Sequence, residues 1–284
     1  MPRPIPKTAL FLVFVTVCID LLGFGLVLPL LPIYGRELTS SMSPATAGMT
    51  LGILMSCYTM MQFLFAPVWG RLSDRFGRRP ILLMSLTGST TFYFLFGLAS
   101  AWRSLTWMFV ARIGAGIAGA TIPTAQAYIA DVTTPEKRAR GMALIGAAFG
   151  LGFTLGPLIG AAATFVSRDV GVSPWPGYAA SGLSAIALCF ALFKLPESLS
   201  REKAPEERRH FDLRLLLDAI RVPSIAVLLV VVFFSVFALA NFEGTISLLI
   251  NDTLKTQTRE ATAAETLTDH DRWLVSLRVS LVFA

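Results

Sequence analysis

Two long apolar runs in this sequence are separated by a short charged segment, Gly70-Arg71-Leu72-Ser73-Asp74-Arg75-Phe76-Gly77-Arg78-Arg79-Pro80. Five of its eleven residues are charged, in a chain of 284 residues in which only 15% are. Ionised side chains are strongly disfavoured in hydrocarbon, so this segment cannot lie inside a membrane. We therefore expect a basic loop at a membrane surface, between two membrane-spanning helices.

The composition predicts an all-α membrane protein. The chain is 54% hydrophobic and its mean hydropathy is +0.66. Apolar runs of about 20 residues, enough to cross roughly 30 Å of hydrocarbon, recur along it. We expect seven spans and the start of an eighth, at residues 9–33, 47–69, 81–100, 105–130, 141–166, 178–195, 222–250 and 273–284. The net charge of +6 comes from basic residues between these spans, so we expect a lipid bilayer and no nucleic acid as partner.

Lys and Arg residues are unevenly divided between the two sets of connections. The N-terminus and every second connection carry 16 of them, and the opposite loops carry six. Because basic residues accumulate on the cytoplasmic side, we expect the N-terminus to be cytoplasmic. The chain would then be a multi-pass protein of the inner or plasma membrane.

Charge also divides the chain into three parts. Residues 1–195 form the predicted N-terminal six-helix bundle, and the highly charged residues 196–221 form a cytoplasmic linker. Residues 222–284 would be a partial C-terminal bundle, with an external polar loop at 251–272.

Asp20 lies near the middle of the first span, with no basic residue one helical turn away. An intramembrane charge is a candidate functional site. A desolvated carboxyl group can exchange protons near neutral pH, so Asp20 could couple protons or substrate to a conformational change. Alternatively it fixes packing through hydrogen bonds, and both interpretations stay open.

The fourth span carries polar and small residues at helical spacing. These are Arg112, Gly116, Gly119, Pro123 and Gln126, separated by 4, 3, 4 and 3 residues. On a regular helix they fall within a stripe about 80° wide. Lipid would not accommodate Arg112, so we expect this stripe to face the bundle interior or a water-filled cavity.

Other spans carry further candidate residues. Gln62 lies in the second span, and Asn241 and Glu243 in the seventh are about 200° apart on a regular helix, so at most one faces a cavity. The fifth span repeats glycine every four residues, at Gly152, Gly156 and Gly160, with Pro157 inside the repeat. This pattern predicts close helix packing, at either a moving or a static interface.

We expect no enzyme, cofactor or metal site. The run Gly114–Gly119 matches a dinucleotide-binding fingerprint, but no strand precedes it and it lies within a span. The sequence contains no phosphate-binding loop or recognisable catalytic grouping. The three cysteines all fall in apolar runs, where they act as small apolar groups.

These motifs together resemble the major facilitator superfamily, and within it the drug:proton antiporters. The segment from Gly70 to Arg79 is similar to the signature between its second and third spans, and Arg112 with Gly116 is similar to its fourth-span motif. Residues 152–160 resemble the fifth-span antiporter motif, with Ala161 where a second glycine is usual. The runs 62–67 and 128–131 are similar to tetracycline antiporters.

The resemblance implies roles for the candidate residues. Asp20 and Arg112 would take part in proton coupling, and four residues would line the substrate cavity: Gln62, Gln126, Asn241 and Glu243. The motif at residues 70–79 would form part of a conformational lock, in which Asp74, Arg75 and Asp131 make a charge cluster. The residues assigned to this lock are Gly70, Asp74, Arg75, Gly77, Arg78, Arg79 and Asp131. Gly152, Gly156, Pro157 and Gly160 would form the antiporter motif.

The resemblance therefore implies export of small amphipathic compounds in exchange for protons, by alternating access. Phe92 stands where tetracycline antiporters carry an acidic residue, which argues against tetracycline itself as substrate. The family has twelve spans, whereas this chain stops early in the eighth. The alternatives are an importer of a small nutrient and a truncated, non-transporting membrane fragment, which could self-associate.

Overall fold

A computed structural model describes residues 9–119, 122–167, 172–199, 222–235 and 237–238. The described residues belong to two compact units, which we describe separately. All regular secondary structure in these residues is helical, so the fold is all-α as predicted.

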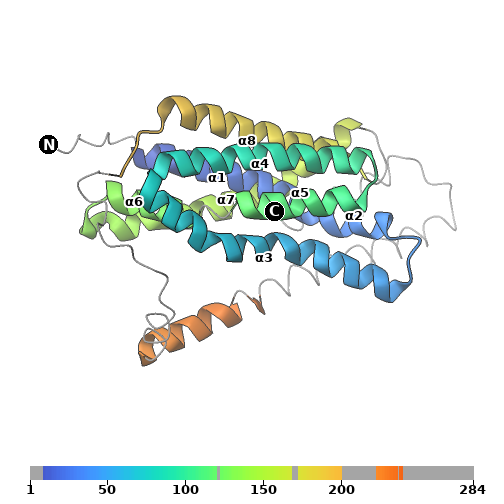
Figure 1. Ribbon diagram of the computed structural model, residues 1–284, viewed down its shortest axis with the longest axis horizontal. Helices are drawn as coiled ribbons and strands as arrows, with labels where there is room; N and C mark the ends of the chain where they lie inside the picture. The colour runs from blue at the N-terminus through green and yellow to red at the C-terminus, as the bar shows by residue number, and fades with distance from the viewer. Residues whose placement is uncertain (1–8, 120–121, 168–171, 200–221, 236, 239–284) are drawn as a thin grey trace. The chain divides into compact units, whose positions relative to one another are not determined.

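The first unit contains the long helices drawn in Figure 1. In chain order they are α1 (Ala9–Val27), the 3-10 turn η1 (Leu28–Leu30), α2 (Leu31–Leu38), α3 (Pro44–Phe76), α4 (Arg78–Ala101), α5 (Leu105–Ala118), α6 (Ile122–Val132), α7 (Pro135–Ser167) and α8 (Trp175–Lys194). These helices form six segments that are long and apolar enough to cross a membrane. The six segments coincide with the first six predicted spans.

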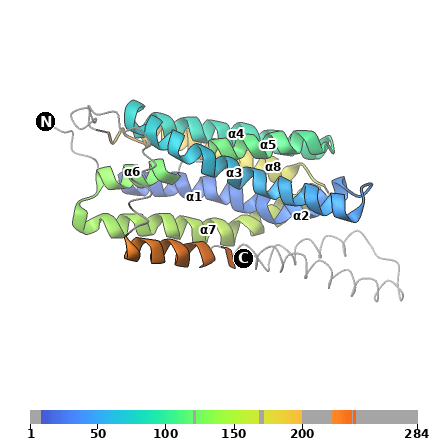
Figure 2. The same cartoon turned by 60° about the horizontal axis from the view of Figure 1, so that its bottom comes forward.

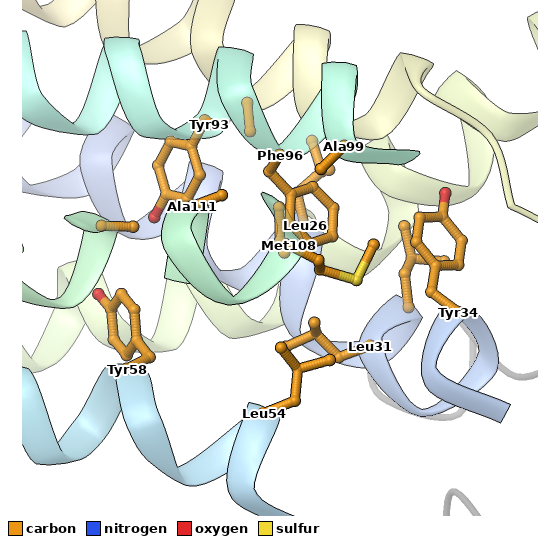
Figure 3. Close-up of a cluster of buried hydrophobic side chains, with 14 of the residues drawn as sticks. Leu26, Leu31, Tyr34, Leu54, Tyr58, Tyr93, Phe96, Ala99, Met108 and Ala111 are labelled. Atoms are coloured by element: carbon orange, nitrogen blue, oxygen red, sulfur yellow. The ribbon is translucent and has the colours of Figure 1, made fainter. Parts of the chain in front are cut away.

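The helices of this unit lie side by side, and α1 is surrounded by its neighbours in both views (Figures 1 and 2). It packs against α7 on one side and α8 on another, while α4 packs against α5 and α8, and α3 against α5. Two clusters of buried apolar side chains fill the spaces between them. One of them, around Leu26, Leu54 and Phe96, is shown in Figure 3.

The predicted loop at residues 70–80 is wrong. Helix α3 continues to Phe76 and α4 begins at Arg78, so only Gly77 separates them. A helix of 33 residues, the length of α3, is about 50 Å long, which exceeds the roughly 30 Å hydrocarbon core. Charged residues can therefore remain helical beyond the membrane. The cost of placing a charge in hydrocarbon excludes it from the membrane but does not exclude it from a helix.

Gly77 makes the sharp reversal between α3 and α4. Its φ angle is 107°, a region that side chains other than glycine rarely adopt. Its amide still donates to the Ser73 carbonyl at 3.1 Å, and this hydrogen bond closes the last turn of α3. We call this end of the six-helix unit the Gly77 end.

The opposite end of the unit is closed by contacts of α2. The Tyr34 hydroxyl donates to the Ser173 carbonyl at 2.7 Å, in the segment that precedes α8. Glu37 pairs with Arg103 at 3.1 Å, and Arg103 has the positive φ angle of 50° in the short turn between α4 and α5. We call this end the Tyr34 end.

The second unit is described only in part. It contains an apolar helix at Pro223–Ser235, within the predicted seventh span at 222–250. The rest of that span, the external loop at 251–272 and the start of the eighth span lie outside the described residues. The linker at 196–221 is described only as far as residue 199.

Candidate transport site

Arg112 on α5 is the largest fully buried side chain of the described residues, with 2% of it exposed. Its guanidinium carbon lies 4.5 Å from the centre of the Tyr58 ring on α3. A cation over an aromatic face is attracted by the ring electrons. Its Nε and Nη1 atoms have no hydrogen-bond partner among the described residues. This arrangement leaves two donors on a buried cation able to bind a further group.

Asp20 on α1 provides the opposite charge. Its Oδ1 atom is buried and has no hydrogen-bond partner in the described part of the chain. The Ser89 hydroxyl of α4 lies within hydrogen-bonding reach of the Asp20 carboxyl group. A carboxyl group that is buried with one oxygen unsatisfied is costly unless it is protonated or bound by another group.

Two tyrosines connect these charges. The hydroxyl groups of Tyr58 and Tyr93 lie within hydrogen-bonding reach of each other and point toward one another in Figure 3. Both interact electrostatically with Asp20 and with Arg112. We call Asp20, Tyr58, Ser89, Tyr93 and Arg112 the central polar cluster. It draws side chains from α1, α3, α4 and α5, so their relative motion would change it.

The stripe predicted on the fourth span is carried by two described helices. Helix α5 ends at Ala118 and α6 begins at Ile122, and residues 120–121 lie outside the described residues, so the single face stays a prediction. Arg112 and Gly116 are buried, and a Cβ atom at Gly116 would lie 2.4 Å from the Tyr58 carbonyl oxygen. Gln126 is exposed on the surface of the described unit.

The Gln62 side chain is hydrogen-bonded to a backbone carbonyl. Its Nε2 atom donates to the Gly119 carbonyl at 3.0 Å, just beyond the end of α5. The cavity-lining role expected for it stays a prediction. The other two predicted cavity residues, Asn241 and Glu243, lie outside the described residues.

A charge cluster lies at the Gly77 end, and Arg78 is at its centre. Arg78 pairs with Asp74 at 2.5 Å and with Asp131 of α6 at 3.2 Å, and it donates to the Ser73 hydroxyl at 2.7 Å. We call Ser73, Asp74, Arg78 and Asp131 the Arg78 cluster. It joins α3, α4 and α6 through one nearly buried guanidinium.

The predicted participation of Arg75 in this cluster is wrong. Its guanidinium lies 5.2 Å from the centre of the adjacent Phe76 ring, and it forms no ion pair among the described residues. Arg75 and Arg78 are three residues apart but separated by the reversal at Gly77, so they point to different neighbours. Gly70, also assigned to the lock, has no atom within 4 Å of a Cβ placed on it.

Glu197, which follows α8, was missed by the sequence analysis. Its carboxylate accepts hydrogen bonds from the amides of Arg78, at 2.8 Å, and Arg79, at 3.2 Å, at the start of α4. A carboxylate there satisfies unpaired amides and complements the helix dipole. The next residue, Ser198, donates to Asp131 at 3.2 Å. The sequence signal was weak, because 119 residues separate Glu197 from Arg78.

The glycines of the fifth span pack against the first span. A Cβ atom on Gly152 would lie 2.9 Å from the Leu21 backbone, and one on Gly156 would lie 2.6 Å from the Gly25 carbonyl carbon. Gly160 similarly approaches the Leu26 carbonyl at 3.0 Å. Pro157 is buried within α7. The repeat therefore brings α7 into backbone contact with α1, immediately beside Asp20.

Comparison with known proteins identifies the family. Residues 13–262 match the sequence profile of the Major Facilitator Superfamily. The chain belongs to this superfamily, and it is an integral membrane protein of a transporter family.

Several relatives have assigned functions. The chain is 41% identical to the class C tetracycline resistance protein of Escherichia coli over 207 residues, which are 72% of this chain and 49% of that protein. It is 34% identical to the class E protein of the same organism over 241 residues, covering 84% of this chain and 56% of that one. It thus spans about half the length of the curated relatives that it matches.

Solved structures of transporters also resemble this chain. The crystal structure of the human organic anion transporter MFSD10 (TETRAN) matches with a TM-score of 0.61 and 31% sequence identity, over 72% of this chain and 50% of that one. A proton:xylose symporter, at 20% identity and a TM-score of 0.52, shares the fold. The six-helix unit is therefore built as in major facilitator transporters.

Proposed function

We propose that this chain acts in proton-coupled export of small amphipathic compounds by alternating access. The observation that carries the proposal is the central polar cluster, in which half-buried Asp20 and buried Arg112 retain unsatisfied buried polar atoms between membrane-spanning helices. Groups of this kind are costly in a membrane and mark ion or substrate pathways. The tetracycline resistance relatives support export as the direction.

In this mechanism the Asp20 carboxyl group gains a proton from one side of the membrane and loses it to the other. Loss of the proton leaves a negative charge beside Tyr58 and Tyr93, which the Arg112 cation stabilises through the same rings. The change in charge alters how α1 and α5 attract each other across the cluster. That difference between the two protonation states is what could shift an equilibrium between inward-facing and outward-facing states.

The Arg78 cluster is the proposed conformational lock. Its ion pairs tie the end of α3 to α6, and the Glu197 carboxylate ties the segment after α8 to the start of α4. The excess of basic residues at this end supports a cytoplasmic location for it, together with the N-terminus. Breaking the cluster would release the Gly77 end during each cycle. The glycine-rich contact between α1 and α7 is the proposed place where α1 can slide, because Gly152 and Gly156 bring backbone against backbone there.

A second candidate substrate class is organic anions. The free Nε and Nη1 donors of Arg112 suit a carboxylate or another anionic group. The human relative whose structure was matched is named an organic anion transporter. An anionic substrate would bind Arg112 directly, whereas an amphipathic cation would be drawn to Asp20.

The test uses a bacterium that lacks its main exporters and expresses the 284-residue chain. Accumulation of a cationic and of an anionic fluorescent dye is followed, with and without a protonophore. We expect lower accumulation of one dye, abolished by the protonophore and by Asp20→Asn. Glu136→Gln, a change of an exposed carboxylate at the start of α7, is the matched control and should export normally. Unchanged accumulation of both dyes, with the protein present in the membrane, would contradict the proposal.

A further inference from the structure

The fourth span contains a proline, Pro123, that removes a backbone donor. In a continuous helix the Gly119 carbonyl would accept from the amide of the fourth residue along, which is Pro123 and has no N–H. The Gln62 amide nitrogen supplies the missing donor at 3.0 Å. Because an unsatisfied carbonyl is costly in a membrane interior, Gln62 compensates directly for Pro123.

Two further side chains bind the same end of α5. Trp69 donates from its indole nitrogen to the Ile117 carbonyl at 2.6 Å. The Ser85 hydroxyl donates to the Ala118 carbonyl at 2.7 Å. Three consecutive carbonyls at the end of one helix therefore accept hydrogen bonds from side chains of α3 and α4.

The three donors are placed by the helices that carry them. Gln62 and Trp69 are seven residues apart on α3, so they lie two turns apart on one face of it. Ser85 lies on α4, where it is buried. Neither helix could shift along α5 without changing which carbonyls are bound.

The stretch from Gly119 to Pro123 lies between the two polar clusters along the chain. Helix α5, on one side of it, carries Arg112 against the Tyr58 ring. Helix α6, on the other side, carries Asp131, which pairs with Arg78 at 3.2 Å. A change of angle between α5 and α6 would move one cluster relative to the other.

We propose that Gln62, Trp69 and Ser85 are positioning residues that hold a hinge in the fourth span, and that Gln62 acts through the Gly119 carbonyl. Side-chain donors suit a hinge because each can turn about its own bonds while the carbonyl it binds changes direction. The inference rests on the proposed function, since it takes the two clusters to work in one transport cycle. It differs from the cavity-lining role predicted for Gln62, in which the amide would contact substrate.

A double-mutant cycle with Pro123→Ala separates these two roles. Alanine restores the backbone N–H at position 123, so the Gly119 carbonyl no longer depends on Gln62. Hydrogen exchange is measured on the purified full chain in lipid nanodiscs, over peptides that span residues 115–132. Gln62→Met, which removes the donor but keeps the size, should speed exchange there about fivefold or more. In the Pro123→Ala background the same change should have less than about a twofold effect.

The control for this cycle is Thr87→Val, which removes an exposed hydroxyl that donates to Leu83 within α4 and should leave exchange over 115–132 unchanged. If Gln62→Met prevents folding, Ser85→Ala replaces it, compared with Ser100→Ala. Ser100 is a buried serine of the same helix that donates to Phe96 within α4. Faster exchange over 115–132 in Ser85→Ala alone supports the hinge. Equal effects of Gln62→Met in both backgrounds, or equal effects of the two serine changes, would overturn it.

Exchange is measured without transport, so the two proposals fail separately. A non-additive cycle in a chain that exports neither dye keeps the hinge and rejects the exporter. An additive cycle in a chain that does export rejects the hinge alone. In an active chain, substrate contact by Gln62 would raise the apparent KM in both backgrounds, whereas a positioning role would lower the maximal rate only where Pro123 is present.

Discussion

The contact between α1 and α7 gives a prediction whose size follows from the structure. Gly156→Ala would place a Cβ atom 2.6 Å from the Gly25 carbonyl carbon and 2.8 Å from the Leu26 nitrogen. Both are backbone atoms, so neither can turn away. Overpacking of this kind costs about 1–3 kcal/mol. The helices would have to separate at Gly25 and Leu26, just over one turn beyond Asp20 on α1.

Gly150→Ala is the matched control on the same helix. A Cβ atom at Gly150 has no neighbour within 4 Å among the described residues. Both changes remove a glycine from a helix and so gain up to about 1 kcal/mol of helix propensity. The difference between the two variants therefore isolates the steric contact, at about 1–3 kcal/mol.

The assay is thermal unfolding of the purified proteins in one detergent, followed by the fraction that remains monodisperse after heating. One kcal/mol corresponds to about 2–4 °C in Tm for chains of this size. We expect Gly156→Ala to unfold roughly 2–12 °C below Gly150→Ala. Equal Tm values would refute the backbone contact between α1 and α7.

Three other predictions use the same unfolding assay. Arg78→Ala should lower the free energy of unfolding by only about 1–2 kcal/mol, because the ion-pair partners of Arg78 are only partly buried. Arg75→Ala, which removes no ion pair of the described residues, should change it by less than about 0.5 kcal/mol. Similar losses in the two variants would contradict the assignment of the cluster to Arg78. Glu197→Ala should cost about 1–2 kcal/mol by removing the cap of α4, and a neutral result would count against that cap. Tyr34→Phe should cost about 1 kcal/mol through loss of the buried bond to the Ser173 carbonyl, and an unchanged Tm would exclude a net contribution from that bond.

Much of the fold could be predicted from the sequence because the membrane restricts it so strongly. The first six apolar runs appear as six helical segments at the expected places. The helix ends could not be predicted in the same way. Apolar runs mark only the part of a helix that lies in hydrocarbon. Helices α3 and α7 are each 33 residues long and so extend beyond that part.

The sequence analysis selected two residues of the central polar cluster, but it did not predict how the cluster is arranged. Asp20 and Arg112 stood out because charges are rare in apolar runs, and both have buried, unsatisfied polar atoms in the central polar cluster. Their connection through Tyr93 could not be foreseen, since it depends on how α3, α4 and α5 meet. The single face on the fourth span stays a prediction, because residues 120–121 between α5 and α6 lie outside the described residues.

The Gly77 end shows why long-range partners escape such an analysis. Helix capping is usually read from residues next to the helix, but the cap of α4 comes from Glu197, far along the chain. The same holds for Asp131, which reaches Arg78 only through the packing of α6. The motif correctly located the charges but not their pairing.

The most direct test of the central claim measures proton movement. The chain is reconstituted in liposomes that carry an internal pH-sensitive dye, and a substrate identified by the accumulation assay is added in the presence of a pH gradient. If Asp20 and Arg112 couple protons to transport, substrate should accelerate dissipation of the gradient, and Asp20→Asn should remove that acceleration while Glu136→Gln preserves it. Equal acceleration in Asp20→Asn and the unaltered chain would contradict the account.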